Sequence, residues 1–127
     1  MLKKFKTYKE CEKAVGLTPG ILPDVSMLPE KYRKSLIADF QTTIITEAHN
    51  EGWEPDFNNH NQPKYSVWPE IDADEKVPSG FGFSHSVFAY SDAYTAVGSR
   101  HLLKSYELAM HVQKQFPEIY KAHILLK

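Results

Sequence analysis

The sequence predicts one α+β domain over residues 1–127, with about three antiparallel strands and helices packed on one face of the sheet. Two patterns predict this class. Apolar residues recur at three- and four-residue steps near both ends of the chain, as in amphipathic helices. In the middle they alternate with polar residues, as in strands that bury one side. The expected order is helix, helix, strand, strand, strand, helix, and 127 residues suffice for a single core.

Two helices are expected before the first strand. Thr7 followed by Glu10 forms a capping box, and Gly16 can end the short first helix. The second and clearest helix runs from Pro29, a favourable first-turn residue, to about Asn50. Its apolar stripe, which we expect to face the core, comprises Leu36, Ile37, Phe40, Ile44 and Ala48.

Three strands are expected between residues 64 and 103. Residues 64–71 alternate, and Pro69 ends this strand or places it at a sheet edge. Residues 81–90 alternate over a longer run, and residues 95–103 are expected to return antiparallel to them. The last two strands each have a mostly apolar side and a mixed side, which suits a sheet that helices cover on one side only.

One more helix is expected near the C-terminal end. Ser105 can cap it, and an apolar stripe continues from there to the region of Tyr120. Pro117 should kink this helix or split it in two, because proline removes a backbone donor from the helix interior.

Composition and charge exclude several classes of function. The formal net charge is −1, from 15 basic and 16 acidic residues, so the chain lacks the basic excess typical of duplex nucleic-acid binders. No run approaches the roughly 20 apolar residues that span a bilayer, and no apolar run follows the N-terminal lysines as in a signal peptide. The single cysteine, Cys11, allows no intramolecular disulfide and suits a reducing compartment. We therefore expect a cytoplasmic protein without a membrane or duplex nucleic-acid partner.

Motifs for catalysis or metal binding are missing from the sequence. It contains no His-Glu-x-x-His pair, no paired cysteines and no Gly-x-Ser-x-Gly elbow. Cys11 lies on an apolar helix side and is expected to be a buried hydrophobe rather than a nucleophile. Each of the six histidines is interpreted as structural, although their acid–base chemistry keeps an enzyme as a third hypothesis. No metal, no cofactor and no catalytic residue is therefore predicted.

Aromatic rings and one arginine are the remaining candidates for function. Arg100 shares its strand side with Gly98, so backbone lies open beside a guanidinium that can grip phosphate or carboxylate. Aromatic rings near it could stack on bases or other planar ligands. The alternative is that the rings belong to the core and that Arg100 pairs with a nearby acid. The predicted ligand-binding residues are Arg100, Tyr65, Trp68, Tyr90 and Trp53.

Several sequence blocks carry a resemblance that extends over nearly the whole chain. They are LPDVSMLPEK, NEGWEPD, KYSVWPEI, SGFGFS, VGSR and KSYELAMHVQKQFPEIYK. In the order and spacing of these blocks the chain resembles a group of short proteins carried by phages and prophages of Bacteroides-type gut bacteria. None of the blocks is a catalytic signature, so the resemblance transfers no functional residue. It implies an accessory role for a virus or mobile element inside the bacterial host cell.

Two functions follow as hypotheses. The first is a non-enzymatic phage or prophage accessory module that binds a protein partner or associates with itself, because aromatic residues lie on a two-sided sheet. The alternative is a protein that binds a small nucleotide-like ligand through Arg100 and Tyr65, Trp68 or Tyr90, with single-stranded nucleic acid as a weaker variant. An open concavity beside Arg100 would favour the second hypothesis.

Overall fold

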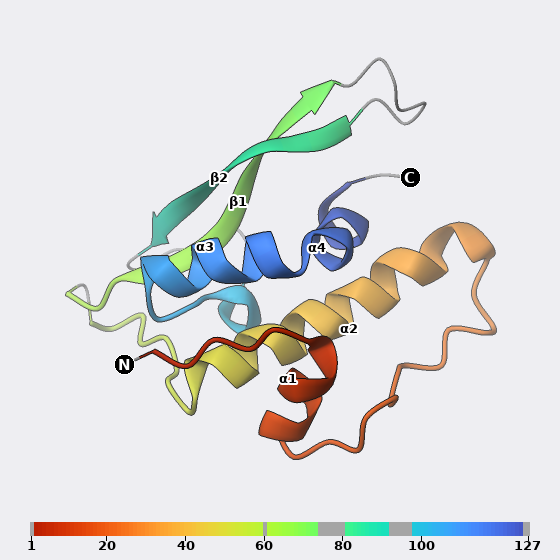
Figure 1. Ribbon diagram of the computed structural model, residues 1–127, viewed down its shortest axis with the longest axis horizontal. Coiled ribbons are helices and arrows are strands. Elements are labelled where there is room, and N and C mark those ends of the chain that lie inside the picture. Colours follow the sequence, from red (N-terminus) through yellow and green to blue (C-terminus); the bar gives the residue numbers. More distant parts are fainter. Residues whose placement is uncertain (1, 60, 74–80, 92–97, 126–127) are drawn as a thin grey trace.

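The structure is mostly helical. It is a computed structural model that describes residues 2–59, 61–73, 81–91 and 98–125 (Figure 1). None of the described helices combines the length and the apolar character needed to cross a membrane. In this part of the chain the elements are, in order, α1 (Tyr8–Ala14), α2 (Glu30–Asn50), β1 (Lys64–Ala73), β2 (Phe81–Ser91), the 3₁₀ helix η1 (Ser99–His101), α3 (Tyr106–Gln115) and α4 (Pro117–Ile124).

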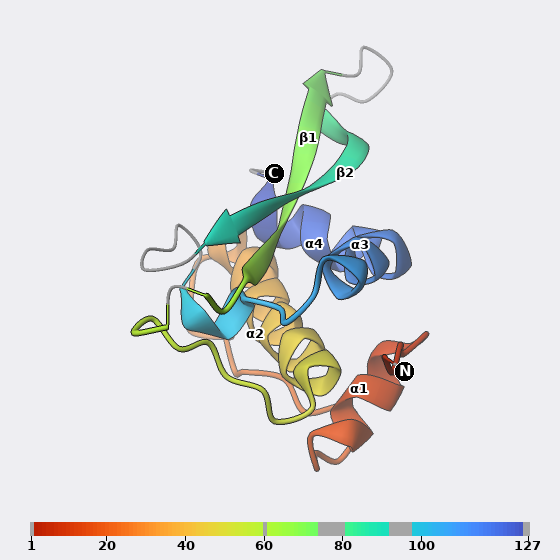
Figure 2. The same cartoon turned by 90° about the vertical axis from the view of Figure 1, so that its left-hand side faces the viewer.

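The helices form the body, and the two strands form a hairpin on one side of it. α3 packs against both strands, while α2 packs against α1, α4 and η1. Figure 1 shows the hairpin on one side of α3 and α4 and shows α2 on the other. In both Figure 1 and Figure 2 the end of the hairpin at which β1 finishes reaches beyond the helices. The long helix α2 is thus the spine of the body, as expected, and part of the hairpin extends past it.

The prediction of three antiparallel strands in the order α-α-β-β-β-α is wrong. The described residues form a single two-stranded antiparallel sheet, β1–β2, and residues 95–97 of the expected third strand lie outside them. Gly98 has a φ of 80°, which turns the chain, and Ser99–His101 then wind into η1 instead of extending. Of residues 98–103, only Leu103 pairs with the hairpin, in a lone antiparallel bridge to Tyr65. Two backbone hydrogen bonds of 2.7 and 3.0 Å form this bridge.

The other two predicted strands, 64–71 and 81–90, are confirmed and extend slightly further along the chain. The strands run antiparallel, and Lys64 pairs with Ser91 at the end of the hairpin nearer the helices. Pro69 lies within β1 rather than ending it. A two-stranded sheet allows this because each strand keeps one edge free of ladder hydrogen bonds.

Local signals in the sequence set the ends of the helices as predicted. Thr7 Oγ1 accepts a hydrogen bond from Glu10 N at 3.2 Å and so caps α1. The Glu10 carboxylate accepts from the Lys6 amide, so the reciprocal half of the capping box is shifted by one residue. Gly16, with a φ of 85°, follows the end of this helix. Pro117 begins α4 directly after α3 has ended, which confirms the split at this proline.

The hydrophobic core lies between the helices and the start of β1. Cys11 is fully buried in it, as predicted. The expected stripe of α2 is only partly right, because Leu36 stays 45% exposed whereas Ile45, outside the stripe, is completely buried. The N-terminal half of α2 is largely exposed, and its C-terminal half is buried on several sides. The buried cluster comprises Phe5, Cys11, Ile44, Ile45, Ala48, Leu103, Leu108, Ala109, Val112, Phe116 and Tyr120.

Two histidines fasten the N-terminal segment to the helices. Phe5 N donates a hydrogen bond to His49 Nε2 at 3.0 Å, and His111 Nε2 donates to Phe5 O at 2.7 Å. Within α2, His49 Nδ1 donates to Ile45 O at 2.7 Å. Because its Nδ1 donates and its Nε2 accepts, His49 is held as a neutral imidazole. Both histidines therefore serve to hold the fold together.

Candidate functional site

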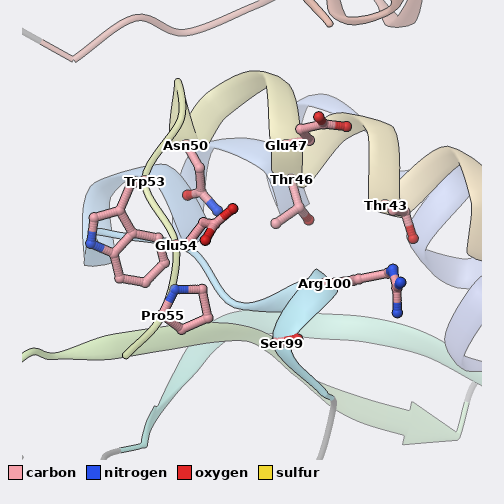
Figure 3. A pocket seen from close by; sticks show the side chains of 9 residues that line it. All are labelled: Thr43, Thr46, Glu47, Asn50, Trp53, Glu54, Pro55, Ser99 and Arg100. Atoms are coloured by element: carbon pink, nitrogen blue, oxygen red, sulfur yellow. The ribbon is translucent and has the colours of Figure 1, made fainter. Parts of the chain in front are cut away.

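An open hollow of about 480 Å³ lies where the C-terminal half of α2, the loop after it and η1 meet (Figure 3). We call it the Arg100 hollow. Its wall carries one guanidinium, two carboxylates, one indole and several hydroxyl or amide groups. The lining residues are Thr43, Thr46, Glu47, Asn50, Trp53, Glu54, Pro55, Ser99 and Arg100.

Asn50, the last residue of α2, fixes two walls of the hollow relative to each other. Its side-chain nitrogen donates to Leu102 O at 2.8 Å, and its side-chain oxygen accepts from Lys104 N at 3.1 Å. These two bonds tie the chain just after η1 to the end of α2. Asn50 is buried, so the bonds are shielded from competition by water. The position of Arg100, two residues before Leu102, follows from this link.

A left-handed turn directly after α2 brings Trp53 to the hollow. Glu51 and Gly52 have positive φ angles of 48° and 88°, and Trp53 N donates to Asn50 O at 2.9 Å. Glycine adopts such a φ without steric cost, so the chain can reverse its direction at this point. In Figure 3 the indole of Trp53 lies at one end of the hollow and Arg100 at the other.

The charged groups of the Arg100 hollow are exposed and carry both signs. Among the described residues, none forms an ion pair or a hydrogen bond with the guanidinium of Arg100. Glu47 and Glu54 add two carboxylates to the same lining. The hollow therefore offers one group that attracts anions and two groups that accept hydrogen bonds from amines.

The structure brings together two of the five residues that were predicted to bind a ligand. Arg100 and Trp53 both line the hollow. Tyr65 packs, partly buried, against the hydrophobic core, which matches the alternative that the rings belong to the core. The side chains of Trp68 and Tyr90 lie outside what the structure describes, although the backbones of Tyr65 and Tyr90 pair across the hairpin.

A second group of polar side chains, contributed by α2, η1 and α4, lies close together, and the sequence did not predict it. Asp39 of α2, His101 of η1 and His123 of α4 form what we call the Asp39 cluster. Asp39 Oδ1 lies 3.2 Å from His101 Nε2 and 3.7 Å from His123 Nδ1. The two imidazole rings have centroids 5.0 Å apart. The pKa of His123 is lowered by burial and by His101, while Asp39 acts in the opposite direction.

A small cavity of about 50 Å³ lies against this cluster. His101, His123 and Tyr120 line it, together with Thr46 and Ser66. Tyr120 is only 4% exposed. Burial raises the pKa of Tyr120 and the neighbouring Thr46 hydroxyl opposes this, yet no described residue meets Tyr120 Oη at hydrogen-bond geometry. The cavity therefore places a buried hydroxyl, which has Thr46 as a polar neighbour, beside two imidazoles.

The spacing of Asp39, His101 and His123 in the sequence does not indicate that they form a cluster. Its members come from three separate elements, and Asp39 and His101 are 62 residues apart. Placing residues 95–103 on a strand also assigned His101 to a sheet instead of to a turn beside α2. Assigning the turn at Gly98 correctly would have been the first step toward the cluster.

Comparison of the chain with protein-family models, with curated proteins and with solved structures finds no match. The resemblance to phage and prophage proteins stays a prediction. Function is therefore inferred from the geometry of this chain's own residues.

Proposed function

We propose that this chain is a binding protein that holds a small nucleotide-like ligand in the Arg100 hollow. The observation that carries the proposal is an exposed guanidinium, with no described partner, in the same open hollow as an indole. Planar rings stack on tryptophan, and the guanidinium fork binds the oxygens of a phosphate or carboxylate. A volume of about 480 Å³ falls within the usual range for small-molecule sites.

The two carboxylates restrict the class of ligand. Glu47 and Glu54 can accept hydrogen bonds from the amino or ring N–H groups of a base, but they repel additional negative charge. Arg100 offsets one negative charge of a ligand. We therefore expect a nucleoside monophosphate or a similar molecule with one anionic group to bind more tightly than a triphosphate.

Thermal unfolding with a panel of nucleosides, nucleoside monophosphates and triphosphates tests this proposal. A ligand at 100 times its Kd stabilises the fold by about 2.7 kcal/mol, which raises Tm by about 10 °C in a domain of this size. Arg100→Ala and Trp53→Leu should each abolish most of this shift. Lys9→Ala, at an exposed position of α1, is the matched control and should keep it. Absence of any shift at millimolar ligand would refute the proposal.

A second candidate, self-association, is favoured by the hairpin. Each strand of the two-stranded sheet has an edge that, beyond the Tyr65–Leu103 bridge, pairs with no other described strand. Unpaired strand edges readily pair with another chain, and two copies of one hairpin can do so symmetrically. Light scattering across a hundredfold range of concentration should then detect a dimer, and a monomer at every concentration would eliminate this candidate. An accessory role of a phage or prophage in the host cytoplasm, which the resemblance implies, fits either candidate.

A further inference from the structure

The Asp39 cluster has the composition and spacing of a metal-binding site. One carboxylate and two imidazoles each present a ligand atom, and these three atoms all lie within 4.8 Å of one another. Donor atoms that share a tetrahedral zinc ion at about 2.1 Å lie roughly 3.4 Å apart. The distances of 3.2 and 3.7 Å from Asp39 Oδ1 to the two imidazole nitrogens bracket that value. We propose that Asp39, His101 and His123 bind one first-row divalent metal ion, with Zn²⁺ as the ion to test.

The type of donor narrows the choice of ion. Imidazole nitrogen suits zinc, cobalt, nickel and iron, whereas calcium and magnesium prefer a full set of oxygen ligands. A site with two histidines and one carboxylate therefore selects against the two most abundant divalent cations of the cell. Calcium and magnesium serve as negative controls.

An arrangement in which Asp39 pairs with two charged histidines at once is a poorer account of the cluster. Charged pairs of Asp39 with both histidines would place two positive imidazoles with their centroids 5.0 Å apart. Like charges at this distance destabilise each other. Two neutral imidazoles and a carboxylate around a shared divalent ion avoid that repulsion.

The neighbouring cavity gives an independent reason to expect a ligand at this place. It has a volume of about 50 Å³, and both histidines of the cluster line it. The buried Tyr120 hydroxyl, which no described residue meets at hydrogen-bond geometry, lines it as well. Three protein ligands leave one position of a four-coordinate ion open, and a cavity of this size can hold a water molecule there. The Tyr120 hydroxyl is then available to hydrogen-bond that water.

Metal titration of the purified 127-residue chain, after treatment with a chelator, tests the proposal. Zn²⁺ should bind one per chain and raise Tm, and Co²⁺ should give visible absorption bands of a low-coordinate site with nitrogen and oxygen ligands. His123→Gln and Asp39→Asn should weaken Zn²⁺ binding by about 100-fold or more, because loss of even an outer-shell partner costs about 10–100-fold. Asp24→Asn, at an exposed carboxylate of the loop before α2, is the matched control and should bind as the wild type does.

The metal-binding proposal can be tested even if a variant folds poorly. The cobalt spectrum of the wild-type chain reports the ligands directly and needs no substitution. Lack of saturable Zn²⁺ and Co²⁺ binding by the folded wild-type chain would overturn the proposal, as would equal binding by folded His123→Gln. The nucleotide test stands apart from this one, because Arg100→Ala should leave metal binding intact and His123→Gln should leave nucleotide binding intact.

Discussion

His49 should make the fold sensitive to mild acid, and its surroundings give the direction of the effect. The imidazole is completely buried, and Phe5 N donates to its Nε2 across 3.0 Å. Protonation of Nε2 would set two N–H donors against each other at that distance. Burial is the largest cause that lowers the pKa of His49, and His111 lowers it further. The Ile45 carbonyl and Glu51 oppose the shift.

The sign of the effect follows from proton linkage. The folded-state pKa lies below the value of about 6.5 in the unfolded chain, so between these two values the unfolded chain binds more protons. The free energy of unfolding should be fully maintained above pH 6.5. As the pH falls toward the folded-state pKa, it should decrease by up to about 1.4 kcal/mol per pH unit.

Urea unfolding of the wild type and of His49→Gln, followed by circular dichroism from pH 5 to pH 8, measures this effect. At pH 8 the substitution should cost about 1–3 kcal/mol, because at least one buried hydrogen bond is lost. The difference in the free energy of unfolding between the two proteins should shrink as the pH falls. The pKa of His123 is also lowered, but its contribution is the same in both proteins and cancels in this difference. His111→Gln should retain an acid-dependent loss of stability, since His49 and the hydrogen bond that it accepts from Phe5 N are still present. A wild-type minus His49→Gln difference that is constant from pH 5 to pH 8 would refute the reasoning.

Two further predictions concern the core. The pKa of Cys11 is raised to about 12 by burial and by the charges of Glu10 and Glu12. The thiol should therefore resist a thiol reagent at pH 8 until urea unfolds the chain. Modification of the native protein at the rate of a free thiol would contradict the burial of Cys11. Ile45→Ala should lower the free energy of unfolding by about 2–5 kcal/mol because Ile45 is completely buried, whereas Leu36→Ala, at a position 45% exposed, should cost less than about 1 kcal/mol. Equal losses for the two variants in urea unfolding would show that α2 packs with a different face toward the core.

Features that depend on neighbouring residues could be predicted from the sequence. The Thr7 cap, the helix from Pro29 to Asn50 and the split at Pro117 each follow from side-chain or backbone chemistry within a few residues. The two strands of the hairpin followed from alternation in the same way. These elements together supply most of the described fold.

The prediction of a third strand was wrong because the alternation of apolar and polar residues does not determine the backbone conformation. Ser99–His101 have a pattern that a strand could use, but Gly98 adopts a φ of 80° and the chain winds into η1. The same error concealed the Asp39 cluster. Arg100 and Trp53, which the sequence analysis grouped, line the same hollow, but the partners of His101 come from α2 and α4, and no local spacing connects them.

The turn η1 is a spacer of fixed length between the Arg100 hollow and the Asp39 cluster. Its middle residue, Arg100, lines the hollow at the end opposite Trp53, and the next residue, His101, reaches Asp39. The segment is anchored downstream by the bridge from Leu103 to the hairpin. One inserted or deleted residue would rotate the side chains by about 120°, the step of a 3₁₀ helix, and would misdirect both at once. This stretch should therefore tolerate an altered side chain at its exposed first position far better than any change in length.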